Sequence, residues 1–275
     1  TKIISSRLFS SGTRLTVLSP ILYSGFTFMR LDLSDYGRPL AKVIANFLKD
    51  TSLTPIHVTI GFIISGLLAV ICILSYEFAA AAIFLILKSI LDAADGELAR
   101  VKNTPSYTGR YIDSVADILL NLLIVLAIWH VSQGSLIYTM LAFIGLELQC
   151  TLYNYYYVIL RNRHKGDTTS RIFEDKAPRA MKGEKQHQVD VLFKLYHLLY
   201  GVFDKTIHSL DSKAVHTKNL PNWFMTAVSC FGLGFQLLII AFMLAFGLEI
   251  HIIPFFIATS LFILVFIGIR KYIIR

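Results

Sequence analysis

The chain has 275 residues, of which 55% are hydrophobic and only 16% are charged, with a mean hydropathy of +0.61. This composition excludes an ordinary soluble domain and predicts an integral membrane protein. A net charge of +8 would suggest nucleic acid as the partner of a soluble protein, but membrane topology explains the basic residues more simply here. Cys72, Cys150 and Cys230 lie in apolar runs without metal-ligand spacing, so neither disulfides nor a zinc site is expected.

Residues 1–54 are predicted to form a basic, amphipathic region at the membrane interface. Residues 1–31 hold four basic residues, no acidic residue and an apolar patch broken by Pro20 and Gly25. This suits an interfacial or re-entrant segment, or an organelle presequence. Over residues 36–50, apolar side chains recur at helical spacing opposite charged ones, which predicts an amphipathic juxtamembrane helix that lies flat on the membrane.

Six apolar stretches follow, each long enough to cross about 30 Å of hydrocarbon. The predicted fold class is therefore an all-α integral membrane protein, with six transmembrane helices preceded by the amphipathic juxtamembrane helix. Residues 55–275 would form this six-helix membrane domain, which includes a cytoplasmic segment at residues 161–220. The spans are predicted at residues 56–74, 78–99, 111–131, 136–160, 223–247 and 250–269.

The basic residues also predict the orientation of the helices. The connections at residues 75–77, 132–134 and 248–249 carry no Lys or Arg, whereas the connections on the other side do. By the positive-inside rule, both ends of the chain and the acidic stretch described below face the cytoplasm. A bacterial inner membrane and the endoplasmic reticulum both fit this arrangement.

The cytoplasmic segment is predicted to have two parts. Residues 161–188 are polar and charged, and we expect them to be irregular. Between Val189 and Phe203, apolar residues recur at helical spacing. A second amphipathic helix is therefore expected there, near the membrane surface.

Four aspartates within residues 92–117 stand out because they lie in otherwise apolar helices. Asp92 and Asp95 fall on one helical face, and Asp113 and Asp117 do the same in the next helix. A carboxylate buried at membrane depth costs roughly 2.5 to 3.5 kcal/mol on insertion scales, so these four require a compensating cation. Oxygen donors from two helices suit Mg²⁺, Mn²⁺ or Ca²⁺, and two such ions about 4 Å apart would hold a phosphoryl or pyrophosphate group.

Written as spacing, this stretch is Asp92-x2-Asp95-Gly96-x2-Ala99-Arg100-x8-Gly109-x3-Asp113-x3-Asp117. The pattern resembles, position for position, the signature of the CDP-alcohol phosphotransferase family. The layout of the chain is similar too, since the family has six membrane helices after an amphipathic juxtamembrane helix, with the signature split between the second and third spans.

The resemblance implies a metal-dependent phosphotransferase of phospholipid biosynthesis. A CDP-linked alcohol would give its substituted phosphate to the hydroxyl of a second alcohol, with release of CMP. Asp92, Asp95 and Asp113 would be ligands of two divalent cations, Mg²⁺ or Mn²⁺. Asp117 would be a ligand of the second cation and the general base for the attacking hydroxyl.

The same resemblance implies contacts to the CDP moiety, to which Asp92 would contribute. Gly96 and Ala99 lack bulk, so the nucleotide could approach the helix backbone closely. Gly109 would open the next helix in the same way.

Three basic residues could contact the substrate. Arg100 could offer a planar guanidinium to a phosphate, or it could simply cap its helix at the membrane boundary. Arg110 is a second, weaker candidate for a phosphate or polar substrate contact. Lys88 lies one turn before Asp92, where it could pair with that carboxylate, extend to the interface or contact the substrate.

The identity of the two alcohols is indicated only by one local difference. Family members that use CDP-diacylglycerol commonly carry an arginine at the start of the first span, whereas residues 54–61 here contain none and depart from the pattern at His57 as well. This favours a small CDP-alcohol donor, such as CDP-choline, CDP-ethanolamine or a CDP-inositol, with a lipid or polyol acceptor. The alternative is a CDP-diacylglycerol-dependent phosphatidyltransferase that makes phosphatidylserine-, phosphatidylinositol- or phosphatidylglycerol-type lipids.

Other functions and an oligomer stay open at this stage. Intramembrane acids could mark a divalent-cation transporter, although such sites usually lie in broken, repeated helices. A membrane prenyltransferase also binds Mg²⁺ and pyrophosphate through aspartates, but on two well-separated motifs. A homodimer fits the family, and small residues at Gly232, Gly234 and Ala245 could allow close helix approach.

Overall fold

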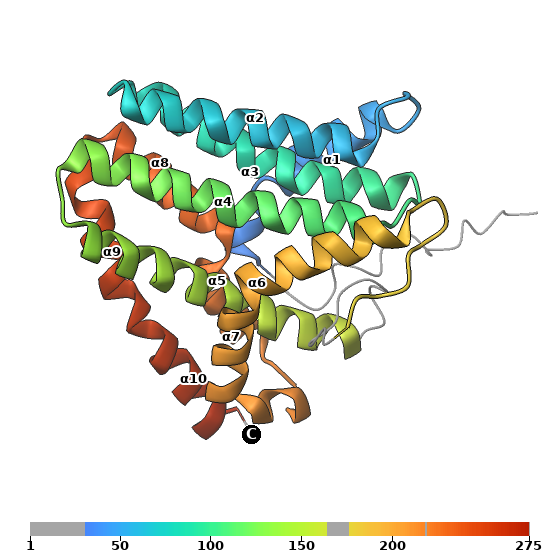
Figure 1. Cartoon of the computed structure of the whole chain (residues 1–275). Helices are drawn as coiled ribbons and strands as arrows, with labels where there is room; N and C mark the ends of the chain where they lie inside the picture. Colours follow the sequence, from blue (N-terminus) through green and yellow to red (C-terminus); the bar gives the residue numbers. More distant parts are fainter. Residues whose placement is uncertain (1–30, 164–175, 218, 275) are drawn as a thin grey trace, which may run out of the picture.

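The computed structural model describes residues 31–163, 176–217 and 219–274, and among these residues helices are the only regular elements (Figure 1). The predicted all-α fold is confirmed. The segment predicted for residues 1–31 lies almost wholly outside the described residues, as does part of the irregular segment at residues 161–188. In chain order the elements are η1 (Leu33–Asp35), α1 (Arg38–Leu48), α2 (Pro55–Leu74), α3 (Phe78–Val101), α4 (Tyr107–Ser132), α5 (Leu136–Arg163), α6 (Gln186–Leu210), η2 (Ser212–His216), α7 (Asn222–Val228), η3 (Ser229–Phe231), α8 (Leu233–Ala245), α9 (Glu249–Ser260) and α10 (Phe262–Tyr272).

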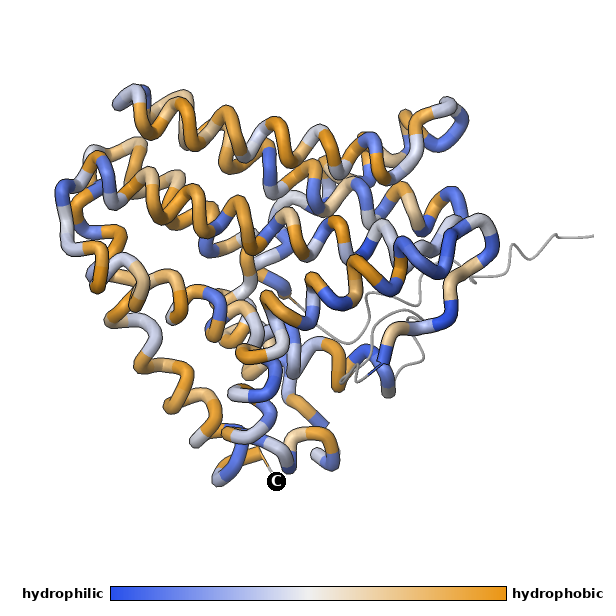
Figure 2. The backbone as a smooth tube through the Cα atoms, viewed as in Figure 1, coloured by the Kyte–Doolittle hydropathy of each residue, from blue (hydrophilic) through white to orange (hydrophobic). Residues whose placement is uncertain are grey.

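Four stretches of the described residues are long and apolar enough to cross a membrane: α2, α4, α5, and α9 together with α10. A fifth is added if α7, η3 and α8 count as one broken span. The prediction of six spans is therefore met for four to five. The remaining predicted span corresponds to α3, which is long enough at 24 residues but carries five charged side chains. In Figure 2, hydrophilic residues gather where α3 ends and where α4 and α6 begin.

The span predicted at residues 223–247 is not one continuous helix. The segments Asn222–Phe231 and Leu233–Ala245 meet at an angle of 52°. Gly232 lies at the break in an extended conformation, with φ −70° and ψ 148°. A Cβ atom at Gly232 or at Gly234 would clash with Ser34 of the segment that precedes α1. These two glycines therefore admit another part of the same chain, so the prediction that they offer small surfaces to a second copy is wrong.

The acidic helix α3 lies in the middle of the bundle, in contact with α1, α2 and α8. A helix, α1, is present where the amphipathic juxtamembrane helix is predicted, and its Ala41 and Ala45 are fully buried against α3. Ile44 and Leu48 pack beside these alanines, whereas Leu40, Val43 and Phe47 are exposed, Phe47 to 81%. Small residues thus allow close packing on α3, while a position at the membrane surface stays a prediction for the outer face.

The second predicted amphipathic helix is present as α6, which packs against α4 and α5. Its Val189 and Phe193 form a buried cluster with Tyr107 and Tyr111 of α4. The Tyr200 hydroxyl donates a hydrogen bond of 3.0 Å to the carbonyl oxygen of Ser114. Helix α6 therefore covers the first half of α4, which carries two of the four signature aspartates.

Candidate active site

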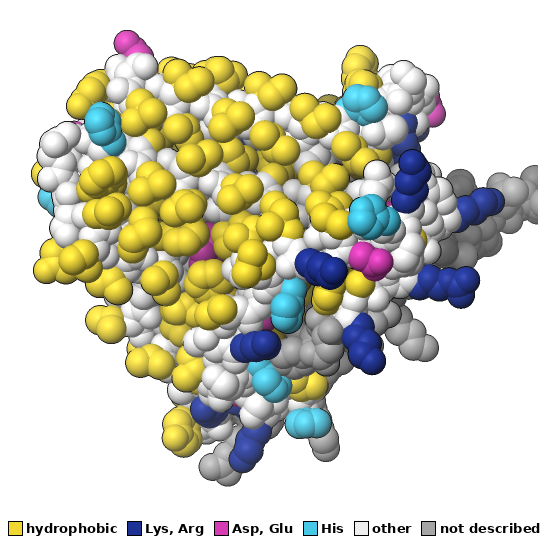
Figure 3. Space-filling view, viewed as in Figure 1, with side chains coloured by type: hydrophobic (Ala, Val, Ile, Leu, Met, Phe, Trp, Pro, Cys, Tyr) yellow, Lys and Arg dark blue, Asp and Glu magenta, His cyan; other side chains and the backbone are white. Residues whose placement is uncertain are grey.

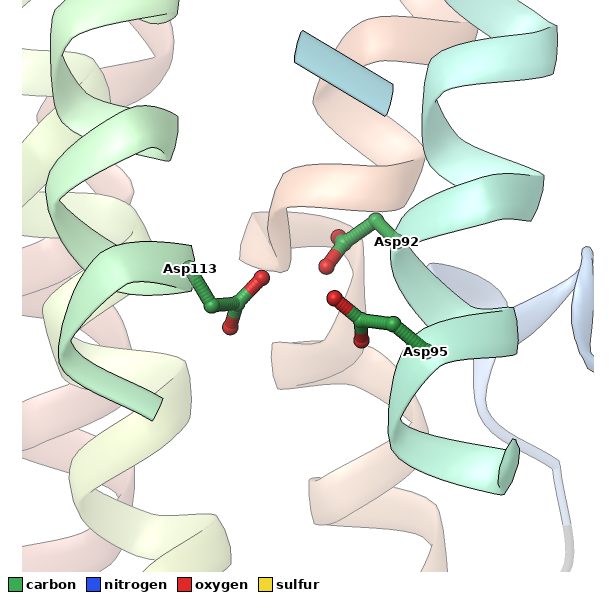
Figure 4. Close-up of side chains that lie close together, drawn as sticks. All are labelled: Asp92, Asp95 and Asp113. Carbon is green, nitrogen blue, oxygen red and sulfur yellow. The ribbon is translucent and has the colours of Figure 1, made fainter. Parts of the chain in front are cut away.

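Three of the predicted metal ligands converge between α3 and α4. Asp92 and Asp95 extend from α3 and Asp113 faces them from α4 (Figure 4). Each offers one carboxylate oxygen, and these oxygens all lie within 4.8 Å of one another. Helical spacing places the first two on one face, and the packing of both α3 and α4 against α2 brings the third opposite them.

The surroundings of these carboxylates leave part of their bonding capacity unused. Thr59 of α2 donates a hydrogen bond of 2.6 Å to Asp95 Oδ2, which fixes one carboxylate against its neighbouring helix. Asp113 Oδ1 is buried and has no hydrogen-bond partner among the described residues. An unpaired buried carboxylate oxygen is costly, so this atom is suited to a ligand.

The fourth aspartate, Asp117, is paired with Lys88 and is not part of this group of three. Lys88 Nζ lies 2.6 Å from Asp117 Oδ1, and the lysine side chain is fully buried. The predicted pairing of Lys88 with Asp92 is therefore replaced by a pair with Asp117, because the lysine reaches across to α4. The ammonium also lies 5.1 Å from the centre of the Phe62 ring, which limits its access to water.

Among the described residues, the carboxylates at the site outnumber the buried cations. Four carboxylates, at residues 92, 95, 113 and 117, face one buried lysine. Hard oxygen donors at this density fit Mg²⁺ or Mn²⁺, which prefer carboxylate ligands. The residues present therefore fit the divalent cations implied by the sequence.

Arg100 lies at the mouth of the site in an ion pair with Glu97. Its Nη2 atom is 3.0 Å from Glu97 Oε1, and half of its side chain is exposed. A Cβ atom on Gly96 would lie 3.6 Å from the same guanidinium, so Arg100 folds back over the glycine. Arg38 of α1 contacts Glu97 as well, at 3.0 Å. The sequence prediction missed Arg38 and the role of Glu97, because their contact joins residues far apart in the chain.

The first turn of α4 is built around Gly109. The Ser106 hydroxyl oxygen accepts a hydrogen bond of 2.8 Å from the Gly109 N–H and donates one to Glu184 at 2.7 Å. Glu184 also accepts hydrogen bonds from the backbone N–H groups of Thr108 and Met181. Burial raises the pKa of the Glu184 carboxyl, but these hydrogen bonds outweigh burial and the net pKa is lowered. The segment before α6 thus holds the start of α4 in place.

The remaining predicted contacts differ in their surroundings. Arg110 stacks over aromatic rings, with its guanidinium carbon 4.6 Å from the centre of the Tyr111 ring and 5.7 Å from that of Tyr107. Ala99 is half-buried on α3, one turn after Asp95. Both therefore border the acidic group without belonging to it.

A second polar pair between α4 and α5 was given no role in the sequence analysis. Asn121 and Glu147 are 3% and 1% exposed, and Asn121 Nδ2 donates a hydrogen bond of 2.9 Å to Glu147 Oε1. Asn121 follows Asp117 by one helical turn, and Glu147 is an acidic residue within a predicted span. Both features are visible in the sequence as polar residues in apolar runs.

The fold and the site together define an α-helical protein with several potential membrane spans and a buried carboxylate centre. Residues 52–181 match the model of the CDP-alcohol phosphatidyltransferase family. The resemblance seen in the sequence is thereby confirmed, and this part of the chain is a CDP-alcohol phosphatidyltransferase domain. No match to an individual curated protein was found.

The family that residues 52–181 match is a family of transferases. It implies transfer from a CDP-linked alcohol to a hydroxyl acceptor in the synthesis of membrane phospholipids. The family and the long apolar helices together indicate an integral membrane protein. The matched residues include α2, α3, α4 and α5, and hence every residue of the carboxylate centre.

Proposed function

We propose that this protein transfers a substituted phosphate from a small CDP-alcohol to the hydroxyl of a lipid acceptor, in a divalent-metal-dependent reaction that releases CMP. The convergence of Asp92, Asp95 and Asp113 within 4.8 Å carries this proposal. A cationic ligand would compensate the charge of three carboxylates at that separation. A pyrophosphate-containing donor is the substrate class that such a centre serves.

The proposed metal ligands are Asp92, Asp95, Asp113 and Asp117, for two divalent cations, Mg²⁺ or Mn²⁺. When bound, the cations would neutralise charge on the pyrophosphate as CMP leaves. The unpartnered Oδ1 of Asp113 supports this assignment.

Asp117 is proposed as the general base for the attacking hydroxyl. Lys88 lies against Oδ1 of this carboxylate at 2.6 Å and orients it, so we assign the proton of the acceptor hydroxyl to Oδ2. Lys88 is therefore a positioning residue in this proposal, and not a substrate contact.

The donor is proposed to bind over the end of α3. Gly96 and Ala99 lack the bulk that would keep the nucleotide from the helix backbone, and Arg100 would meet a phosphate after leaving Glu97. Gly109 serves the cap of α4, so its role is to let Ser106 approach. Arg110 is a weaker phosphate contact, since its guanidinium lies against two tyrosine rings.

The preference for a small CDP-alcohol such as CDP-choline, CDP-ethanolamine or CDP-inositol rests on the start of α2. No arginine is present at residues 54–61. His57 Nδ1 lies 3.1 Å from the Thr54 backbone nitrogen, so it caps the helix. A CDP-diacylglycerol donor is the alternative, and a divalent-cation transporter is a remote one.

The membrane arrangement is proposed as predicted from the sequence. Helix α3 completes the set of six spans, and its contacts with α1, α2 and α8 shield its charges. The carboxylate centre faces the cytoplasm, and the membrane is a bacterial inner membrane or the endoplasmic reticulum. Residues 1–54 and 55–275 are the interfacial region and the membrane domain. A homodimer would use a surface other than Gly232 and Gly234, for example the exposed Ala245.

The test is CMP release by the purified protein with Mg²⁺ or Mn²⁺. CDP-choline, CDP-ethanolamine, CDP-inositol and CDP-diacylglycerol are supplied one at a time with lipid and polyol acceptors. Metal-dependent CMP release from one of the small donors is the expected result. Release from CDP-diacylglycerol alone would select the alternative donor, and metal flux in sealed vesicles without CMP release would select the transporter.

A further inference from the structure

The polar pair Asn121 and Glu147 has an incomplete set of hydrogen bonds. Asn121 Nδ2 donates to Glu147 Oε1 at 2.9 Å, whereas Asn121 Oδ1 is buried and finds no hydrogen-bond partner in the described part of the chain. Because the carboxylate accepts from the amide nitrogen, the amide oxygen is the atom left unpaired. An isolated buried acceptor of this kind is rare in folded proteins and needs an explanation.

The unpaired oxygen belongs to a residue next to the proposed general base. Asn121 follows Asp117 by four positions on α4, so both side chains lie on the same face of the helix, one turn apart. Glu147 on α5 interacts electrostatically with Asp117 and Lys88. The pair is thus part of the same buried neighbourhood as the reacting groups, between α4 and α5.

The outside of this neighbourhood is apolar. Leu119 and Leu123 of α4 and Leu141 and Ile144 of α5 are between 40% and 49% exposed. In Figure 3, acidic surface is visible among the apolar side chains between α4 and α5. The Asp117 side chain retains 13% exposure. A ligand that reaches this neighbourhood from the outside therefore crosses an apolar face.

We propose that Asn121 and Glu147 form the binding site for the hydroxyl of a lipid alcohol, the acceptor of the reaction. The O–H group of the lipid donates a hydrogen bond to Asn121 Oδ1, and Glu147 is a positioning residue that keeps this oxygen available. A hydroxyl supplies the single donor that Oδ1 needs, and the apolar face between α4 and α5 favours an acceptor with hydrocarbon chains over a soluble polyol. This inference rests on the proposed function and assigns its acceptor site.

The first variant is Asn121→Leu, which removes the accepting oxygen at nearly constant volume. CMP release is measured in detergent micelles with the preferred CDP-alcohol and a diacylglycerol as the lipid alcohol. We expect the KM for diacylglycerol to rise roughly tenfold, the scale of one hydrogen bond, while the KM for the CDP-alcohol is unchanged. If this variant does not fold, Asn121→Ala removes the same oxygen without new branching.

The second variant, Glu147→Gln, tests the positioning role. A glutamine can donate to Asn121 Oδ1 and so allows the amide to turn, whereas the glutamate can only accept when ionised. We expect a smaller rise in the KM for diacylglycerol, roughly threefold, with the melting temperature within a few degrees of the wild type.

The matched control is Gln236→Leu. Gln236 is 1% exposed and its Oε1 is also unpartnered, but its amide nitrogen donates to Gln149 and to Leu146, between α5 and α8. Loss of this buried amide should lower stability without a change in the KM for diacylglycerol. An equal rise of that KM in the control would show a general packing effect and overturn the assignment.

Two further outcomes separate this inference from the proposed function. If the wild type releases CMP with diacylglycerol and Asn121→Leu leaves both KM values unchanged, the acceptor site is wrong and the function stands. If the wild type releases CMP only with a soluble polyol such as myo-inositol, the lipid acceptor is wrong while the reaction class stands. If no CDP-alcohol yields CMP, the proposed function itself fails, and the inference fails with it.

Discussion

Two buried groups of charged residues in this protein differ in whether the chain balances them. At the end of α6, Asp211 is 1% exposed and pairs with Arg270 of α10, and Tyr156 donates a further hydrogen bond of 2.8 Å to the same carboxylate. Between α3 and α4, four aspartates lie near one fully buried lysine, Lys88, among the described residues. The first group is paired within the chain and serves the structure. In our proposal the second group is completed by divalent cations, and a group of buried charges with this imbalance is typical of a functional site.

The largest expected effect is that of Asp113→Asn, which removes one charge from the unbalanced group. Turnover should fall by more than about a hundredfold and Mn²⁺ affinity should drop, because a ligand loses its charge. The fold should persist, since the substitution lowers the repulsion between carboxylates. CMP release and Mn²⁺ titration by electron paramagnetic resonance check this, and activity near the wild-type level would contradict the metal assignment.

The matched change in the balanced group is Asp211→Asn. Here the arginine loses its partner inside the protein, so the free energy of unfolding should fall by about 3 to 5 kcal/mol, the usual cost of breaking a buried pair. Thermal unfolding in detergent measures this loss. The folded fraction should bind Mn²⁺ like the wild type, and a selective loss of metal binding would remove the contrast between the two groups.

The charge of Asp35 is balanced only in part, because its partner Arg38 also pairs with Glu97. Burial raises the pKa of the Asp35 carboxyl to about 6, against the opposing effect of Arg38. A raised pKa in the folded state means that the associated stability is present below pH 4 and is lost as the pH rises through about 6. The wild type should therefore lose about 2 kcal/mol of stability between pH 4 and 7.

Asp35→Asn serves as the comparison for this pH dependence. The neutral side chain cannot ionise, so its melting temperature should vary less over the same pH range. Parallel curves for the two proteins would show that Asp35 does not titrate there.

The smallest expected effect on stability is that of Glu184, a carboxylate that is stabilised by hydrogen bonds instead of a cation. Glu184→Ala should lower the free energy of unfolding by about 1 kcal/mol, since the start of α4 loses its cap. The lowered pKa places this stability above pH 4.5, and it should disappear as the pH falls through the folded-state pKa. Melting curves at pH 7 and pH 4 check this, and a constant difference between variant and wild type would contradict it.

Several features of the fold could be predicted from local patterns. Long apolar runs predicted α2, α4 and α5, because a helix surrounded by apolar groups is apolar on all sides. Helical periodicity predicted α1 and α6, because a helix that is buried along one face has apolar residues at helical spacing. Fixed spacing placed Asp92 and Asp95 on one helical face. The family assignment followed from the same stretch and agrees with the match over residues 52–181.

Other features depend on contacts between distant segments. The bend at Gly232 arises where Ser34 packs against it, and the partner of Lys88 is on α4 instead of on its own helix. No role could be predicted for Glu147 from the sequence, because its hydrogen-bond partner, Asn121, lies on another helix. No pattern within one helix contains this information.

The amino-acid sequence was sufficient for the class of protein, the family and most of the helices, since hydrophobic content and helical spacing are local properties. The tertiary structure decided which charges meet. It brought Asp113 to Asp92 and Asp95, paired Asp117 with Lys88, and left Asn121 Oδ1 without a partner. Charge balance depends on distances between helices, and only the packed bundle sets those distances.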